Sequence, residues 1–361
     1  MWLLLRYGDV EHVITNATAF SVERFRSLEQ RPAMAAVARV LRHWTVYRDP
    51  PEHTRLRALL ARLFTPRRLQ GLQPRIQAIV DRLLDHAADR RTTDFIADFA
   101  FPLPASVIAT MLGVPLNDLD RVRAWSDRIA QFIGGARTGA DAENAGRGLI
   151  EACEYFRELI RVRDARAGDD VLGVLLAAEE QGDKLTEDEV VANCVLLLFA
   201  GHETTTNLLG NGLYHLLRHP AQEAILRARP TLLASAIEEF LRYDAPVAGT
   251  IRIVTEDVTL DGRRLRRGQP VAAMLAAANR DPRRFERPDD LDVTRTPNRH
   301  LTFGFGTHFC LGASLARLEG QTAFETLLRR FRRVRLLEDA PPWKRQLFFR
   351  ELQRLPVTLE S

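Results

Sequence analysis

The chain has 361 residues, of which 46% are hydrophobic and 27% are charged, so its composition excludes collagen-like, low-complexity and disordered proteins. Its 51 lysines and arginines nearly balance its 47 acidic residues, and the formal net charge of +4 is too small to indicate nucleic-acid binding. The three cysteines are widely spaced and predict no disulfide framework, which favours a reducing compartment.

Neither of the most apolar segments has the features of a membrane anchor. Residues 2–5 are apolar, but this run is far shorter than the ~20 residues that span a bilayer. Residues 190–201 include Asn193 and lead directly into His202 and Glu203. We therefore expect no signal peptide, no membrane contact and a cytoplasmic location.

Most of the chain before residue 245 has apolar residues at three- and four-residue steps, which is typical of helices with one buried face. The predicted helices cover residues 9–17, 52–63, 72–88, 102–112, 116–132, 142–164, 186–217 and 231–243. Thr186 is followed three residues later by Glu189, just ahead of an apolar run. This capping box predicts where the longest helix begins.

After Pro246 the pattern changes to short segments rich in β-branched residues, which predict strands at 250–254, 258–260 and 271–275. Residues 281–300 contain three prolines and little periodicity, so we expect a long irregular connection there. A last helix over 311–330 and strand-like terminal segments complete the chain. The sequence therefore predicts a mostly helical α+β fold, with residues 1–361 in a single domain.

Cys310 lies in the segment FGFGTHFCLG, residues 303–312, directly before a predicted helix. The free N–H groups and partial positive charge of a helix N-terminus predict a lowered pKa for its thiol. The glycines of the segment let the backbone fold closely around the sulfur, as an axial thiolate ligand to haem iron requires. On this segment alone, an inert buried cysteine is the commoner alternative. A metal cluster is excluded because no second cysteine lies nearby, and a dinucleotide loop because Phe309 replaces its third glycine.

The segment AGHETTTN, residues 200–207, interrupts the apolar longest helix with polar side chains. Thr204 lies four residues after Ala200, so its hydroxyl can bond that carbonyl and open a local bulge. Glu203 is an ionisable group in an apolar neighbourhood, which suits proton transfer. Hydroxyls bonded to the preceding turn are the simple alternative. A zinc protease is excluded because Thr206 stands where the second histidine of H-E-x-x-H would be.

Two further charged pairs have simple interpretations by themselves. Glu239 and Arg242 lie three residues apart on one helix face, an arrangement typical of a weak surface ion pair. His53 and Arg57 lie four apart after a proline-led helix start, which is typical of a solvated basic face.

Taken together, the order and spacing of these segments resemble a bacterial cytochrome P450 over nearly the whole chain. FGFGTHFCLG resembles the haem-binding loop of that family, with Cys310 as the proximal thiolate. Residues 200–204 resemble the oxygen-binding segment of its long distal helix. Glu239 and Arg242 resemble its E-x-x-R pair, to which Arg295 would add a third partner. The resemblance implies a large helical region around haem b and a small β-rich region.

The resemblance also implies which residues hold the cofactor. His53, Arg57, Arg252 and His308 stand where the family uses cations for the two haem propionates, because buried carboxylates need paired donors. The expected cofactor-binding residues are Cys310, His53, Arg57, Arg252, His308, Ala200, Gly201, Phe303, Gly304 and Gly312.

The reaction implied is the insertion of one oxygen atom from O2 into a lipophilic small molecule. A thiolate ligand favours O–O cleavage, and Thr204 and Glu203 would organise water and deliver protons as the catalytic residues. The chain contains no flavin or iron–sulfur segment, so electrons would come from a ferredoxin-type donor and its reductase. The residues expected to line the substrate pocket are Phe199, Ala200, Val247, Thr250, Ile251 and Phe348. No charged anchor for a substrate is evident among them.

Two departures from the family pattern leave alternatives open. The chain opens at MWLLLRYGDV, which resembles a strand and helix that most relatives place several dozen residues later. The first helix and strand of the family are therefore expected to be absent, so that either the start of the chain is misassigned or a sheet edge is exposed. Glu351 stands near a position where relatives often have glycine. A haem-thiolate binding or sensing protein is one alternative, and a peroxide-driven peroxygenase, which needs no Glu–Thr proton relay, is another.

Overall fold

The computed structural model describes residues 1–135, 138–162, 173 and 185–360. The helices are α1 (Tyr7–Thr15), α2 (Phe25–Glu29), α3 (Ala35–Leu41), α4 (Glu52–Ala61), α5 (Pro66–Ala88), α6 (Pro102–Leu112), α7 (Leu119–Ile133), α8 (Gly139–Val162), α10 (Glu187–Arg218), α11 (Pro220–Ala228), α12 (Leu233–Tyr243), α13 (Leu275–Ala278) and α14 (Ala313–Arg330). The strands are β1 (Trp2–Leu4), β2 (Phe20–Ser21), β3 (Thr93–Asp94), β4 (Thr250–Val254), β5 (Val258–Leu260), β6 (Arg263–Leu265), β7 (Pro270–Ala273), β8 (Arg333–Leu336) and β9 (Pro356–Glu360). The structure therefore has the mostly helical α+β fold that the sequence predicts.

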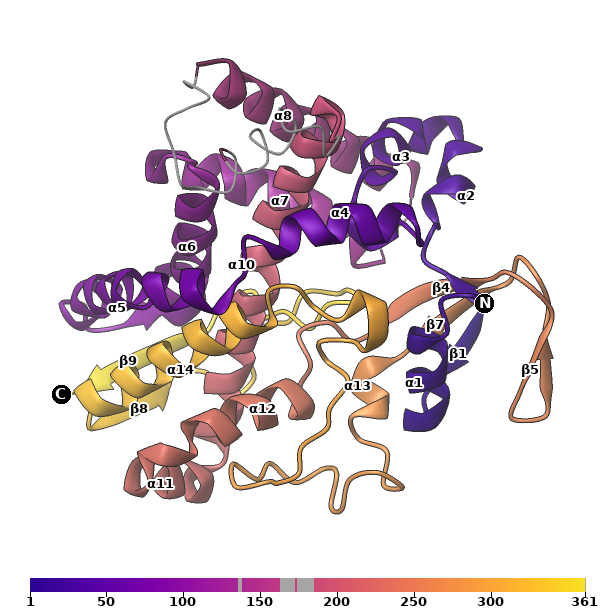
Figure 1. The fold of residues 1–361 in the computed structure, drawn as a ribbon. Helices are drawn as coiled ribbons and strands as arrows, with labels where there is room; N and C mark the ends of the chain where they lie inside the picture. The colour runs from indigo at the N-terminus through magenta and orange to yellow at the C-terminus, as the bar shows by residue number, and fades with distance from the viewer. Residues whose placement is uncertain (136–137, 163–172, 174–184, 361) are drawn as a thin grey trace.

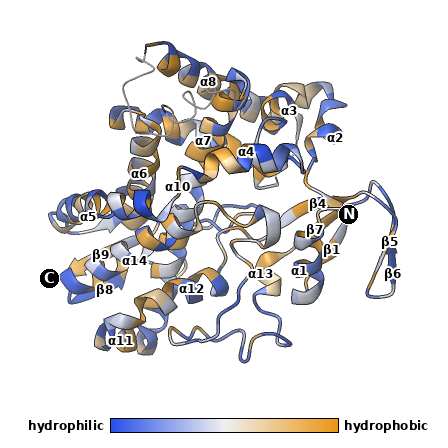
Figure 2. Ribbon diagram, in the orientation of Figure 1, coloured by the Kyte–Doolittle hydropathy of each residue, from blue (hydrophilic) through white to orange (hydrophobic). Residues whose placement is uncertain are grey.

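The largest sheet has the strand order β1-β7-β4-β2, in which β1 runs parallel to β7 and the other pairs are antiparallel. This sheet and α1 lie on one side of the molecule, and the long helices lie on the other (Figure 1). The β5–β6 hairpin projects from the sheet and is mostly hydrophilic, whereas β4 and β7 are mostly hydrophobic (Figure 2). The hydrophobic strands therefore face the interior and help to enclose the site.

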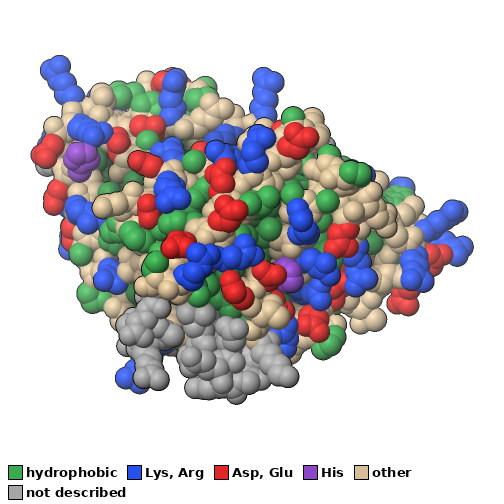
Figure 3. Space-filling model, turned by 90° about the horizontal axis from the view of Figure 1, so that it is seen from above, with side chains coloured by type: hydrophobic (Ala, Val, Ile, Leu, Met, Phe, Trp, Pro, Cys, Tyr) green, Lys and Arg blue, Asp and Glu red, His purple; other side chains and the backbone are tan. Residues whose placement is uncertain are grey.

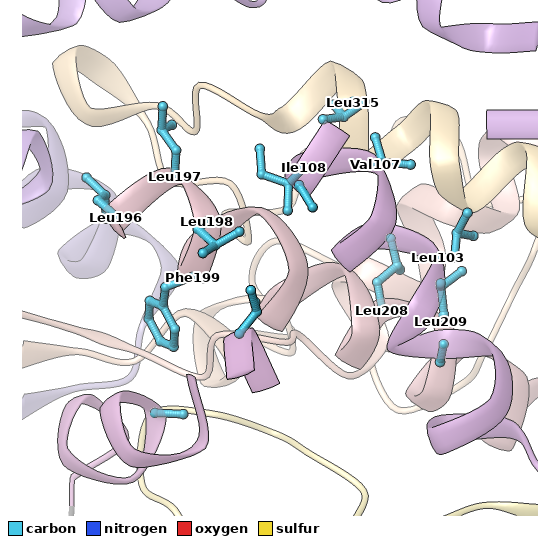
Figure 4. Close-up of a cluster of buried hydrophobic side chains, with 14 of the residues drawn as sticks. Leu103, Val107, Ile108, Leu196, Leu197, Leu198, Phe199, Leu208, Leu209 and Leu315 are labelled. Carbon is cyan, nitrogen blue, oxygen red and sulfur yellow. The ribbon is translucent and has the colours of Figure 1, made fainter. Parts of the chain in front are cut away.

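Helix α10 runs through the middle of the helical region and is buried on most of its sides. Its predicted start is confirmed, because Thr186 and Glu189 form both hydrogen bonds of the capping box. Leucines of α10 pack against Leu103, Val107 and Ile108 of α6, and α14 passes nearby (Figure 4). Burying such side chains stabilises the fold by about 1.5–3 kcal/mol each, so α10 is a rigid wall for the site.

At Gly201, α10 packs closely against Ile108 of α6. A Cβ atom added there would lie 2.7 Å from Cγ1 of Ile108, which is closer than carbon atoms pack. The absence of a side chain at Gly201 therefore sets the distance between the two helices beside the site.

The predicted elements agree with the structure in most places. Residues 116–118 form a 3₁₀ turn before α7 rather than part of the helix. The predicted helix 142–164 corresponds to α8 as far as Val162, and residues 163–164 lie outside the described residues. The connection over 281–300 has no helix or strand, as predicted.

Four of the described helices were not predicted: α2, α3, α11 and α13. Helices α2, α3 and α13 have five, seven and four residues, which is too short for a helical period to show. Helix α11 begins with Pro220 at its first position. Proline there indicates a helix start, but the prediction rested on the hydrophobic pattern alone. Helix α5 begins at Pro66 instead of residue 72, because packing on α14 outweighs the helix-weakening Gly71 and Pro74.

The connection 281–300 is anchored to α12 by a buried ion network. Glu239 and Arg242 are fully buried and paired, and Arg295 of the connection donates to Glu239 at 3.1 Å. Arg242 also donates to the backbone carbonyl of Pro288. Because this connection leads into the Cys310 segment, the network positions one wall of the site.

On the face seen from above, basic and acidic side chains are interspersed (Figure 3). Elsewhere in the structure, ion pairs join different elements, such as Arg157 of α8 with Asp188 of α10 at 2.7 Å. None of the described helices is both long and apolar enough to cross a membrane.

Candidate active site

The main cavity lies between α10 and the loop of residues 303–312, and its volume is about 390 Å³. Segments far apart in the sequence meet there. The sequence-predicted residues that line it are His53, Arg57, Phe199, Ala200, Gly201, Thr204, Val247, Thr250, Arg252, Phe303, Gly304, His308, Cys310, Gly312 and Phe348.

Two predicted site residues do not line the main cavity. Ile251 packs with Ala272 and Phe348 behind the wall, because successive residues of a strand point to opposite faces and Thr250 and Arg252 take the cavity side. Its assignment to the substrate pocket therefore stays a prediction. Glu203 faces a different cavity, described below.

The loop that carries Cys310 is shaped by its own backbone. Cys310 N–H donates to the carbonyl of Phe303 at 2.8 Å, and Gly304 N–H donates to Leu301 at 2.8 Å. Gly304 and Gly306 have φ of 70° and 69°, in the left-handed region that favours glycine. These turns direct the free thiol of Cys310 into the cavity, just before α14 begins.

The surroundings of Cys310 act on its thiol in opposite directions. Burial raises its pKa, whereas the backbone N–H groups of Gly312 and Ala313 and the nearby Arg57 and Arg317 favour the thiolate. The net pKa is raised, so the lowering expected from the helix N-terminus is wrong. The Cys310 side chain is exposed to the cavity, and iron coordination would deprotonate the thiol outright.

Four cationic or imidazole side chains gather at the same end of the cavity. The rings of His53 and His308 are 4.0 Å apart between centroids, and Arg57 Nη2 donates to the Phe309 carbonyl at 2.7 Å. Burial lowers the pKa of His308 to about 3, with help from His53, Arg252 and Arg57. Its Nε2 is buried and has no hydrogen-bond partner among the described residues. Such a cluster suits an anionic ligand.

Thr204 stands on the α10 side of the cavity. Its Oγ1 donates to the carbonyl of Ala200 at 3.3 Å, a long hydrogen bond. The predicted bulge is not found, since α10 is helical throughout this segment. The hydroxyl of Thr204 is therefore held weakly and remains accessible from the cavity.

Glu203 faces a second cavity of about 130 Å³, whose lining includes Lys344, Glu351 and Asp127. Lys344 forms ion pairs with Glu351 and, at 3.0 Å, with Asp127. Burial raises the pKa of Glu203 well above its usual value, and Glu351 raises it further. One oxygen of Glu203 and one of Glu351 are buried without hydrogen-bond partners among the described residues. The carboxyl group of Glu203 therefore favours its protonated form, although Lys344 acts in the opposite direction.

Several cavity residues were missed by the sequence analysis. Arg24 and Tyr47 line the main cavity, so a charged side chain that the sequence did not make evident is available to a substrate. These residues lie in a region of short elements, where no periodic pattern indicates which side chains face inward.

The chain was compared with known proteins. A family model described as Cytochrome P450 matches residues 149–351. The chain is 41% identical to cytochrome P450 CYP107DY1 of Priestia megaterium, over 99% of this chain and 89% of that protein. The chain belongs to the cytochrome P450 family. This P450 is also 39% identical to the biotin biosynthesis cytochrome P450 of Bacillus subtilis, over 99% of the chain and 90% of that relative.

Solved structures give the same result. P450BioI in complex with hexadec-9Z-enoic acid ligated acyl carrier protein matches with a TM-score of 0.94 and 39% identity, over 99% of this chain and 92% of that one. The myxobacterial CYP267B1 in complex with myristic acid matches with a TM-score of 0.93 and 41% identity, over 100% and 90% of the two chains. The P450 fold predicted from the sequence is confirmed.

Members of this family bind haem and use O2 and redox partners, and the chain is a P450 monooxygenase. The residues of the main cavity fit that cofactor. The Cys310 thiol is available to a metal, and no carboxylate is among the described lining residues to neutralise the cation cluster. The partnerless Nε2 of His308 also lacks an acceptor that an anionic group would supply.

Proposed function

We propose that this P450 uses haem b to insert one oxygen atom from O2 into a lipophilic small molecule. The observation that carries the proposal is that the free thiol of Cys310 and the hydroxyl of Thr204 line one cavity, in which the cation cluster also lies. The cavity is otherwise mostly apolar, which suits a lipophilic ligand.

Cys310 would bind the iron, and His53, Arg57, Arg252 and His308 would hold the two propionates. When bound, the haem supplies activation of dioxygen, and its thiolate ligand favours cleavage of the O–O bond. The protein supplies orientation, exclusion of water and protons. Arg252 is buried, so its charge-assisted hydrogen bonds would be strong.

Thr204 and Glu203 would deliver protons from neighbouring faces of their helix segment, each of which borders its own cavity. Glu203 keeps its proton because burial disfavours the carboxylate. Thr204 presents a hydroxyl to the main cavity and can release its long bond to Ala200. Because the two side chains face different cavities, a rotation of Glu203 or a chain of water molecules must connect them.

Two features support the choice of substrate and electron donor. The relatives include a P450 bound to a fatty acyl carrier protein and one bound to myristic acid, which supports an aliphatic or similarly lipophilic substrate. Members of the family use redox partners, and the donor proposed for this chain is of the ferredoxin type with its reductase.

The experiment that tests the ligand assignment is the reduced carbon-monoxide spectrum of the haem-loaded protein. We expect a thiolate-type band in the wild type and in Cys153→Ala, whose cysteine is buried elsewhere, and loss of that band in Cys310→Ala. An unchanged spectrum in Cys310→Ala contradicts the assignment.

The experiment that tests the reaction uses labelled dioxygen, a surrogate ferredoxin and reductase, and a panel of lipophilic compounds. We expect one labelled oxygen atom in the product. Tight haem binding without labelled product across the panel would indicate a binding or sensing protein. Equal turnover with peroxide alone would indicate a peroxygenase.

A further inference from the structure

The charge on the wall of the main cavity is unbalanced. Among the described residues that line it there are three arginines, Arg24, Arg57 and Arg252, and no aspartate or glutamate. Haem brings two carboxylates, so the lining residues and the cofactor together hold one arginine more than they hold carboxylates, and Asp49, outside the lining, acts on Arg252.

Arg57 and Arg252 are the two arginines placed for the haem propionates. Arg57 donates to the backbone carbonyl of Phe309 in the Cys310 loop. The charges of Arg57 and Arg252 both help to lower the pKa of His308 in that loop. Arg24 comes from the segment after β2, and its charge helps to lower the pKa of Arg252. Among the described residues, Arg24 forms no hydrogen bond or ion pair with the Cys310 loop. Arg24 is therefore the arginine in excess.

The position of Arg24 is fixed by an aromatic wall rather than by an acidic partner. Its Nη2 donates to the hydroxyl of Tyr47, and its Cζ lies 4.5 Å from the centre of the Tyr47 ring. Tyr47 stacks on Trp44, and Trp44 stacks on Phe199 of α10. A continuous apolar surface thus leads from the guanidinium to the residue directly before Ala200.

The carboxylates near Arg24 are engaged elsewhere. Glu23 pairs with Arg26 and Arg48, and Asp49 accepts hydrogen bonds from Ser21 and from the Val22 N–H. Arg24 forms no ion pair with a carboxylate among the described residues. Four of the five N–H donors of this guanidinium therefore have no recorded acceptor, which leaves one edge free for a planar anion.

We propose that Arg24 binds the carboxylate of the substrate and that this P450 acts on aliphatic carboxylic acids. The apolar wall of Tyr47, Trp44 and Phe199 would hold the hydrocarbon chain and direct it toward the centre of the cavity. This inference rests on the proposed function, which supplies the haem that would oxidise the hydrocarbon chain of the substrate.

The test compares an acid with its uncharged methyl ester in the haem-loaded full-length protein. Tetradecanoate and methyl tetradecanoate are titrated separately, and binding is followed by the haem absorption shift and by calorimetry. We expect the wild type to bind the acid at least about tenfold more tightly than the ester, as a charge-assisted hydrogen bond provides. Arg24→Gln should remove this preference by weakening acid binding alone.

Three variants make the result specific. Arg24→Lys keeps the charge but not the bidentate geometry and should retain part of the preference. Tyr47→Phe removes the hydroxyl that orients Arg24 and should reduce acid binding by a few fold while ester binding is unchanged. Arg31→Gln changes an exposed arginine outside the cavity and should alter neither ligand.

Two outcomes overturn the inference. One is equal binding of acid and ester by the wild type. The other is an unchanged acid-to-ester ratio in Arg24→Gln together with a loss of haem, which would make Arg24 a propionate ligand. A wild type that shows the thiolate-type carbon-monoxide band without acid preference contradicts this inference alone. Absence of that band contradicts the proposed function.

Discussion

Arg242 holds Glu239 with two parallel hydrogen bonds, since its Nε and Nη2 each lie 2.8 Å from one carboxylate oxygen. Neither side chain is exposed. A buried charge is costly unless it is paired, so each residue stabilises the fold only while the other is present. From the sequence alone, this pair was typical of a weak surface ion pair. It is instead the centre of the network that anchors residues 281–300.

Removal of one partner from this pair is expected to destabilise the protein strongly. Glu239→Gln leaves the Arg242 guanidinium buried without a counterion, and we expect the free energy of unfolding to fall by about 3–5 kcal/mol. Urea unfolding of the haem-loaded protein measures the change. Glu158→Gln breaks the exposed pair with Arg161 and should cost less than about 1 kcal/mol. Equal losses in the two variants would show that burial of the Glu239 pair is unimportant.

The close approach of α6 and α10 gives a second prediction. Gly201→Ala places a methyl group against Ile108, and overpacking of this kind costs about 1–3 kcal/mol. Gly71→Ala in α5, where nothing lies within 4 Å of the new Cβ, should instead stabilise by about 0.5–1 kcal/mol. Thermal unfolding measures both changes. If Gly201→Ala is no less stable than the wild type, the contact does not limit the helix spacing.

The sequence predicted the long helices and the Cys310 loop because their signals are local. The capping box at Thr186 fixes the start of α10, and glycines at positive φ fix the loop around Cys310. The surroundings of Arg24 have no comparable local signal. Its place in the cavity depends on Tyr47 and Trp44, which the fold brings against Phe199.

The separation of Glu203 from Thr204 was, in contrast, available from the sequence. Adjacent residues of an α-helix point about 100° apart. In a helix buried on most sides, such neighbours face different surroundings, and here each faces its own cavity. What the sequence cannot show is the identity of the far partners, Lys344 and Glu351, because they come from the last part of the chain.

The hydroxyl of Thr204 is expected to control how well electron use is coupled to product formation. In Thr204→Ala we expect reductant consumption to continue, while product formed per electron falls by about tenfold or more and hydrogen peroxide is released. Thr322→Ala is the matched control, because Thr322 also bonds the carbonyl four residues earlier but lies outside both cavities. Unchanged coupling in Thr204→Ala would remove Thr204 from the proton path.

The carboxyl group of Glu203 is expected to make the stability of the protein depend on pH. Burial raises its pKa, and Glu351 raises it further, so the native state keeps a proton that the unfolded chain releases above about pH 4.3. The free energy of unfolding should therefore fall as the pH rises above that value, by up to about 1.4 kcal/mol per pH unit for one proton. The fall ends once the pH exceeds the native pKa.

Glu203→Gln removes this titration, so its stability should vary less between pH 5 and pH 8 than that of the wild type. Urea unfolding at several pH values measures the difference. Glu154→Gln, at an exposed position on α8, should keep the wild-type pH dependence. If Glu203→Gln shows the same pH dependence as the wild type, Glu203 is ionised in the native protein, paired with Lys344, and cannot hold the proton assigned to it.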